Sequence, residues 1–167
     1  MISRENIEAT CLEVGNLTAD EMAHEFERFF KAQPSIAEFV MQLTGDSGQK
    51  IQESSLFLSF MVVKIMQKAS VAEVPVVQPA ELDAAFHNSE GWIERMNDAE
   101  GGHNASSLVA EIIAAEDEPN LMGYVVGEIN QAQQDGSDLE EEEKGEIFFV
   151  LRTVISSLSQ TISKGVS

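Results

Sequence analysis

Apolar side chains recur along this chain at spacings of three and four residues, the period of one face of an α-helix. The clearest stripe follows Thr18 and Glu21, which have the spacing of a capping box. Its apolar positions are Met22, Phe26, Phe29 and Phe30. Pro34 cannot continue that helix, so we predict a helix from 19 that ends or bends near 31–33.

Comparable stripes, separated by Gly, Pro and short polar segments, run through the rest of the chain. They predict helices over 4–14, 34–44, 47–68, 79–97 and 106–116, a helix from Pro119 to a loop at Gly136, and a last helix over 138–164. No segment has the alternation of a strand. We therefore predict an all-α protein, a helical bundle of about six to eight helices in one domain, residues 1–167.

The helix over 47–68, which Asp46 or Ser47 can cap, is apolar around most of its circumference, so we expect it at the centre of the bundle. The next segment, 71–79, contains two prolines and is predicted to be an extended connector on the surface.

Two stretches of the chain resemble each other. The sequence QPSIAEFVMQL (33–43) aligns with EPNLMGYVVGE (118–128), and ESSLFLSFMVV (53–63) aligns with KGEIFFVLRTV (144–154). Any two amphipathic helices share such a stripe, so chance similarity is the alternative explanation. The alignment raises the hypothesis of two similar three-helix units, 18–69 and 105–163, joined by a connector over 70–104.

The last predicted helix begins with an unusual run of acidic residues. Ser137 precedes Glu140 by three residues, the capping-box spacing, and carboxylates in a first turn interact favourably with the helix dipole. A helix start needs only one or two of them. The run is therefore also a candidate partner-binding surface, composed of Glu140, Glu141, Glu142 and Glu143.

The chain is strongly acidic, with 29 acidic and 10 basic side chains and a formal net charge of −19. The excess is concentrated in one region, since residues 98–146 hold 14 acidic residues and one basic residue. Such a field repels nucleic-acid phosphates and anionic membrane surfaces, so we expect no binding to nucleic acid or membrane. It favours a basic protein partner.

A few sequence features limit the cellular location and the disulfide or metal chemistry that this chain can have. Cys11 is the single cysteine, which excludes an intrachain disulfide and a cysteine-based zinc site. The first ten residues lack the apolar run of a secretory signal. The most apolar run, 56–66, includes Lys64 and is shorter than the roughly 20 residues of a membrane span. We expect a cytoplasmic protein.

A metal site is one alternative function. Glu21 and His24 have the Glu-x-x-His spacing that places two ligands on one helix face, and Glu100 and His103 repeat it in a Gly-rich segment. Two such pairs with further carboxylates can hold a di-metal centre between helices. Short motifs of this kind also arise by chance in an acidic chain, with both histidines solvated.

No catalytic motif stands out in the sequence. The segment around Gly136 lacks two of the strong ligands of an EF-hand loop, and the chain has no GxSxG, phosphate-binding or Rossmann glycine pattern. His87 and Glu90 could act as acid and base, but no nucleophile motif accompanies them. The sequence therefore favours a non-enzymatic protein without a cofactor.

Three functions remain as hypotheses. The first is interaction with a basic protein or self-association as a dimer, which an exposed apolar patch would favour. The second is the metal-binding protein, which converging carboxylates and histidines would favour. The third is an acidic mimic of nucleic acid, which ordered rows of carboxylates would favour.

Overall fold

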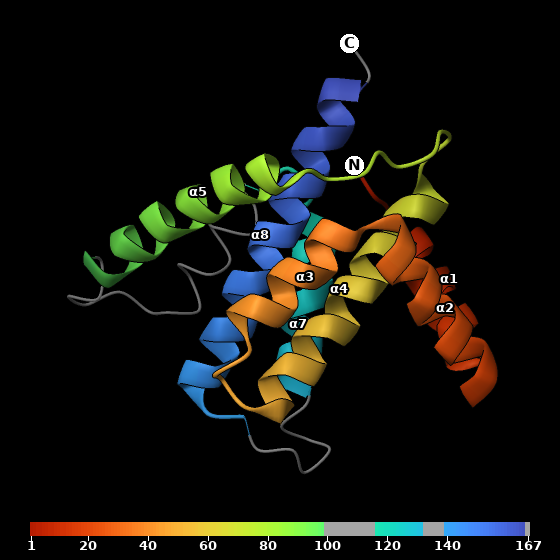
Figure 1. Cartoon of the computed structure of the whole chain (residues 1–167), viewed down its shortest axis with the longest axis horizontal. Helices are drawn as coiled ribbons and strands as arrows, with labels where there is room; N and C mark the ends of the chain where they lie inside the picture. The colour runs from red at the N-terminus through yellow and green to blue at the C-terminus, as the bar shows by residue number, and fades with distance from the viewer. Residues whose placement is uncertain (99–115, 132–138, 166–167) are drawn as a thin grey trace.

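A computed structural model describes residues 1–98, 116–131 and 139–165 of the chain (Figure 1). These residues form seven helices and no strand, which confirms the all-α prediction. The helices are α1 (Arg4–Gly15), α2 (Ala19–Ala32), α3 (Pro34–Leu43), α4 (Gln49–Ala69), α5 (Pro79–Asp98), α7 (Pro119–Gln131) and α8 (Glu141–Gly165). None of the described helices has the length and apolarity that a bilayer crossing needs.

Helices α4 and α8 form the middle of the bundle. Helix α4 packs against α1, α2, α3 and α8, and α8 packs against α3, α4, α5 and α7 (Figure 1). The fully buried side chains that join them include Val62, Ile65, Leu151, Val154 and Leu158. The predicted central position of the 47–68 helix is confirmed, because its apolar circumference needs neighbours on several sides.

The first two helices begin where the sequence predicts. Ser3 accepts a hydrogen bond from the Asn6 N–H at 3.2 Å. At the start of α2, the Thr18 hydroxyl accepts from the Glu21 N–H at 3.2 Å, and the Glu21 carboxylate accepts from the Thr18 N–H at 3.0 Å. This reciprocal pair is the predicted capping box.

The predicted cap of α4 is wrong. The residue that precedes α4 is Gly48, and no side chain caps the helix. Gly48 has φ of 98°, a backbone conformation that glycine adopts without the steric penalty of a Cβ atom. The chain therefore turns through Gly48 before the helix starts, which leaves Asp46 and Ser47 outside the capping position.

The connector after α4 is held to the bundle by a buried glutamine. Gln33, between α2 and α3, is only 1% exposed. Its Nε2 donates to the Pro75 carbonyl at 2.9 Å, and its Oε1 accepts from the Val77 N–H at 2.9 Å. Residues 73–78 are non-helical, as predicted, but Val74 and Val77 are buried, so the segment is not simply a surface connector.

Three predictions concern residues outside the described part of the chain. Ser137 lies there, but Glu140, its predicted partner in a capping box, is described and precedes α8, which begins at Glu141. The predicted helix over 106–116 lies almost wholly outside the described residues. Because that helix belongs to the second of the two predicted three-helix units, the internal repeat stays a prediction.

Candidate functional site

The predicted metal ligands Glu21 and His24 lie on exposed parts of α2. The Glu21 carboxylate serves the capping box, and its hydrogen bonds with the backbone and then the side chain of Thr18 lower its pKa below the ordinary value. The His24 ring lies beside Glu27, with 4.0 Å between Nδ1 and Oε2. Within the described residues, no group of three or more His, Cys, Asp or Glu side chains could hold a metal ion. Glu100 and His103 lie outside those residues.

The predicted acidic surface lies at the start of α8. Glu143 accepts a hydrogen bond from the Glu140 N–H at 3.0 Å, so one of the four glutamates stabilises the helix start. Glu140 and Glu142 are exposed, and the side chain of Glu141 lies outside the described part. A basic partner for this surface stays a prediction.

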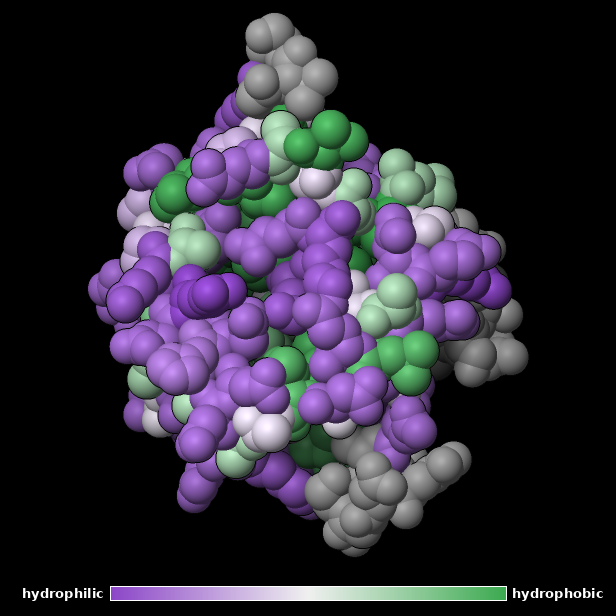
Figure 2. Space-filling view, turned by 90° about the vertical axis from the view of Figure 1, so that its right-hand side faces the viewer, coloured by the Kyte–Doolittle hydropathy of each residue, from purple (hydrophilic) through white to green (hydrophobic). Residues whose placement is uncertain are grey.

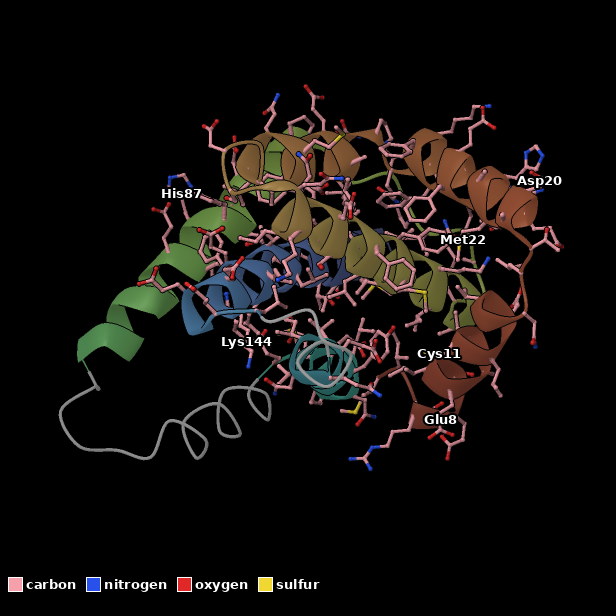
Figure 3. All side chains as sticks on the ribbon, turned by 90° about the horizontal axis from the view of Figure 1, so that it is seen from below. Glu8, Cys11, Asp20, Met22, His87 and Lys144 are labelled. Carbon is pink, nitrogen blue, oxygen red and sulfur yellow. The ribbon has the colours of Figure 1, made fainter. Side chains whose placement is uncertain are left out.

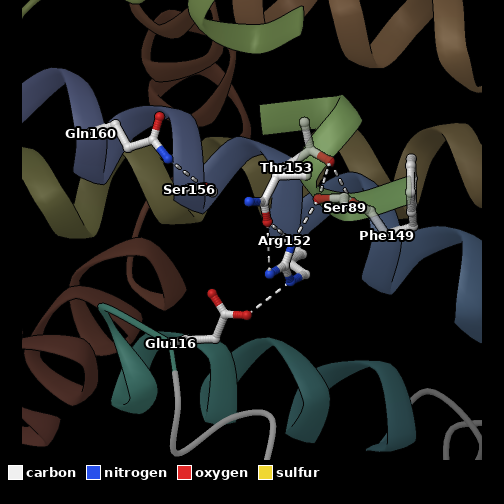
Figure 4. Close-up of polar contacts among 8 residues, drawn as sticks. Ser89, Glu116, Phe149, Arg152, Thr153, Ser156 and Gln160 are labelled. Atoms are coloured by element: carbon white, nitrogen blue, oxygen red, sulfur yellow. Dashed lines mark hydrogen bonds and ion pairs between the residues drawn. The ribbon is translucent and has the colours of Figure 1, made fainter. Parts of the chain in front are cut away.

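A buried polar cluster joins α5 and α8 to the segment before α7 (Figure 4). Its centre is Arg152, whose side chain is 9% exposed. The guanidinium donates from Nε to Glu116 at 2.8 Å and from Nη1 to the Ser89 hydroxyl at 2.8 Å. Both Nη atoms also lie 3.3 Å from the Asn88 amide oxygen, and the Thr153 hydroxyl lies 3.1 Å from that of Ser89. Each polar group named here therefore has a partner.

The side chains of this cluster are suited to a structural role and not to catalysis. The Ser89 hydroxyl lies against a guanidinium and another hydroxyl, neither of which is a base that could remove its proton. The Glu116 carboxylate is engaged by Arg152. The cluster therefore fixes α5 and α8 relative to each other.

A second charged region lies in a cleft of about 550 Å³ between α1, α2 and α4. Lys64 Nζ lies 2.8 Å from the Glu25 carboxylate, which Arg28 also approaches at 3.4 Å. Lys68 on α4 forms an ion pair with Glu13 on α1. Opposite charges are thus matched within the chain, and the pairs link α1 and α2 to the central helix.

Cys11 lies on the side of α1 that faces α7 (Figure 3). Burial raises the pKa of its thiol, the nearby carboxylates of Glu128 and Glu8 act in the same direction, and a hydrogen bond with Tyr124 opposes them. Burial likewise raises the pKa of the Tyr124 hydroxyl. A thiol that stays protonated is a poor nucleophile, so this pair belongs to the packing of α1 on α7.

The strongest candidate site is an apolar surface that the bundle leaves uncovered. We call it the α2–α3 apolar surface. Its exposed residues are Ala19, Ala23 and Phe30 on α2 with Pro34 and Met41 on α3, and the half-buried Met22 and Phe26 and the buried Ala37 border it. Phe30 is 39% exposed and Met41 is 45% exposed. These are high values for large apolar side chains.

The width of the apolar face of α2 explains this exposure. On one side of the helix Phe29 is buried, and the Phe26 ring stacks on Phe60 with 4.4 Å between ring centroids. Met22 lies on the side that faces the bundle, and Asp20 points away from it (Figure 3). Phe30, the next residue, lies about 100° around the helix from Phe29 and stays 39% exposed. Among the described residues of α2, Phe29 alone is fully buried.

Two shallow hollows follow this surface. One, of about 700 Å³, lies along Ala19, Ala23 and Phe30, and the other, of about 430 Å³, lies between Phe30 and Met41. Figure 2 views the side of the molecule that carries α1 and α2, and hydrophobic residues form separate patches there among hydrophilic ones. A side chain from another protein could enter either hollow.

Sequence reasoning missed the Arg152 cluster and the exposure of Phe30. The signal for the first is a charged residue within the apolar stripe of α8, as with Lys64 in α4. Comparisons of the chain with protein-family models, with curated proteins and with solved structures find no match.

Proposed function

We propose that this chain is a non-enzymatic helical protein that binds another protein through the α2–α3 apolar surface. The observation that supports the proposal is the partial exposure of Phe30 and Met41 beside two hollows. Exposed apolar side chains that gather on one face of a folded protein can mark an interaction site.

An amphipathic helix is the partner that fits this surface best. Helix α2 spans about 20 Å at 1.5 Å per residue, which matches a partner helix of three to four turns. Burial of the exposed remainder of Phe30 and Met41 contributes about 1 kcal/mol each. The small Ala19 and Ala23 side chains allow the partner helix to come close to the α2 backbone.

Photo-crosslinking tests the proposal. A benzophenone amino acid is placed at position 30, and a matched control carries it at His87, which is exposed on α5. We expect a protein adduct from position 30 in lysate of the cells that make this protein. The adduct should be lost when Met41→Glu is added, because a carboxylate then enters the apolar surface.

The comparison between probe positions decides the outcome. Adducts of equal yield from positions 30 and 87, or an adduct from position 30 that is unchanged by Met41→Glu, would contradict a specific site. A Gln49→Glu change adds the same charge at an exposed position on α4, outside both hollows, and should leave the adduct in place.

A further inference from the structure

We infer that the helix that binds α2 is α2 of a second copy of this chain, in antiparallel orientation. This inference rests on the proposed function, since it names the partner of the same surface. It follows from the order of small and large apolar residues along α2 and from the order of its charges.

The apolar residues of α2 have the spacing of a coiled-coil seam. Ala19, Ala23, Phe26 and Phe30 are separated by four, three and four residues, the alternation of a and d positions in a heptad. The two small residues come first and the two large ones follow. A two-fold axis between Ala23 and Phe26 therefore sets Phe30 of each copy against Ala19 of the other.

This arrangement fills the hollow on α2. The hollow of about 700 Å³ is lined by the apolar residues Ala19, Met22, Ala23, Phe26 and Phe30, and also by His24 and Glu27. In the antiparallel pair, Phe30 of the second copy enters it beside the two alanines. Because Phe26 already stacks on Phe60, Phe30 supplies most of the new apolar contact. A parallel pair would place Phe30 against Phe30 and leave the alanines facing each other.

The charges of α2 favour the same orientation. Residues 19–25 carry three acidic side chains and no Lys or Arg, whereas 26–32 carry Glu27 with Arg28 and Lys31. Arg28 already pairs with Glu25 in the cleft beside α4, and Lys31 lies 3.9 Å from Glu27 of its own helix. An antiparallel pair would bring Lys31 near Asp20 of the second copy. A parallel pair would bring the two acidic halves together.

The chain is also acidic around this surface. Residues 19–42, which contain it, hold five acidic and two basic side chains, and the whole chain holds 29 and 10. At about 0.15 M salt, exposed charges more than roughly 8 Å apart are largely screened. Salt therefore reduces the repulsion between two copies.

Charge reversal at two exposed positions, Asp20 and Lys31, tests this arrangement. We expect the wild-type chain to approach twice its monomer mass of 18.3 kDa in sedimentation equilibrium as its concentration rises. Lys31→Glu sets two carboxylates together at both symmetric contacts, and Asp20→Lys sets two ammonium groups together at both. Each variant alone should dissociate about tenfold more readily than wild type.

An equimolar mixture of the two variants provides the sharpest readout. In a mixed pair both contacts join oppositely charged side chains. One contact joins the two introduced side chains, and the other joins the original Asp20 and Lys31. The mixture should therefore form a heterodimer, whereas each variant alone should associate more weakly than wild type. Lys50→Glu changes the net charge equally at an exposed position on α4 and should leave the wild-type association unchanged. Circular dichroism should show wild-type helicity for all three variants.

The outcomes separate this inference from the proposed function. A wild-type chain that stays monomeric, or a mixture that associates no better than its components, overturns the antiparallel pair. If the probe at position 30 still captures a different protein that Met41→Glu releases, the proposed function stands without self-association. Loss of both results rejects both.

Discussion

Replacement of Gln33 by leucine should destabilise the protein far more than the small chemical change suggests. Gln33 is buried between α2 and α3, and its amide holds the connector through the Pro75 carbonyl and the Val77 N–H, each at 2.9 Å. Leucine fills nearly the same volume but makes neither hydrogen bond. The substitution therefore isolates the polar contacts from packing.

The expected magnitude follows from what each backbone group loses. The Val77 N–H is buried, and leaving it without an acceptor costs about 1–3 kcal/mol. The Pro75 carbonyl is partly accessible, so water replaces much of its lost bond. We expect Gln33→Leu to lower the free energy of unfolding by about 2 kcal/mol. Gln33→Ala should cost about 1–2 kcal/mol more, since it also leaves a cavity.

Urea unfolding followed by circular dichroism measures this difference. The urea concentration at half unfolding should fall, but the dependence of the free energy of unfolding on urea concentration should stay the same. The reason is that the substitution lowers stability without changing the surface area that unfolding exposes. Gln42→Leu is the matched control: Gln42 is exposed and bonds only Glu38, four residues away, so its loss should cost less than about 0.5 kcal/mol. If Gln33→Leu unfolds at the same urea concentration as Gln42→Leu, the connector is not held as described.

Two further changes test other contacts. Arg152→Ala should lower the free energy of unfolding by about 3–5 kcal/mol because it removes a buried guanidinium and leaves the Glu116 carboxylate, only 13% exposed, without its partner, whereas Glu116→Gln, which keeps a hydrogen-bond acceptor, should cost less. Equal urea midpoints for the two variants would contradict this order. Cys11 gives a pH dependence: burial holds the folded thiol neutral while the unfolded thiol ionises, so stability is complete below about pH 8.5 and declines above it. Urea midpoints between about pH 7 and 10 should fall less steeply for Cys11→Ser than for wild type, and parallel curves would refute the assignment.

Local signals in the sequence predicted the helices well. The capping box of Thr18 and Glu21 is a relation over three residues, and Pro34 and Pro79 begin helices because their fixed φ suits a first turn. The start of α4 was mispredicted because Asp46, Ser47 and Gly48 are all compatible with a helix start, and tertiary packing selects among them.

The candidate site was predictable only in part. The stripe that contains Phe30 is visible in the sequence, but periodicity cannot tell which part of a wide apolar face the bundle covers. Arg152 and Glu116 are 36 residues apart, and Gln33 and Val77 are 44 apart. Such pairings depend on how the helices are arranged, which no local pattern encodes.

The packing of α4 against α8 has a consequence for the folding of this protein during its synthesis on the ribosome. Helix α4 begins at Gln49 and its main core partner begins at Glu141, 92 residues later. At a synthesis rate of about 5–20 residues per second, about 5–18 s pass between the synthesis of the start of α4 and that of the start of α8. During that interval Val62 and Ile65, fully buried in the finished bundle, lack the neighbours that later cover them. The nascent chain is thus most exposed to aggregation, and to capture by chaperones, well before its last helix emerges.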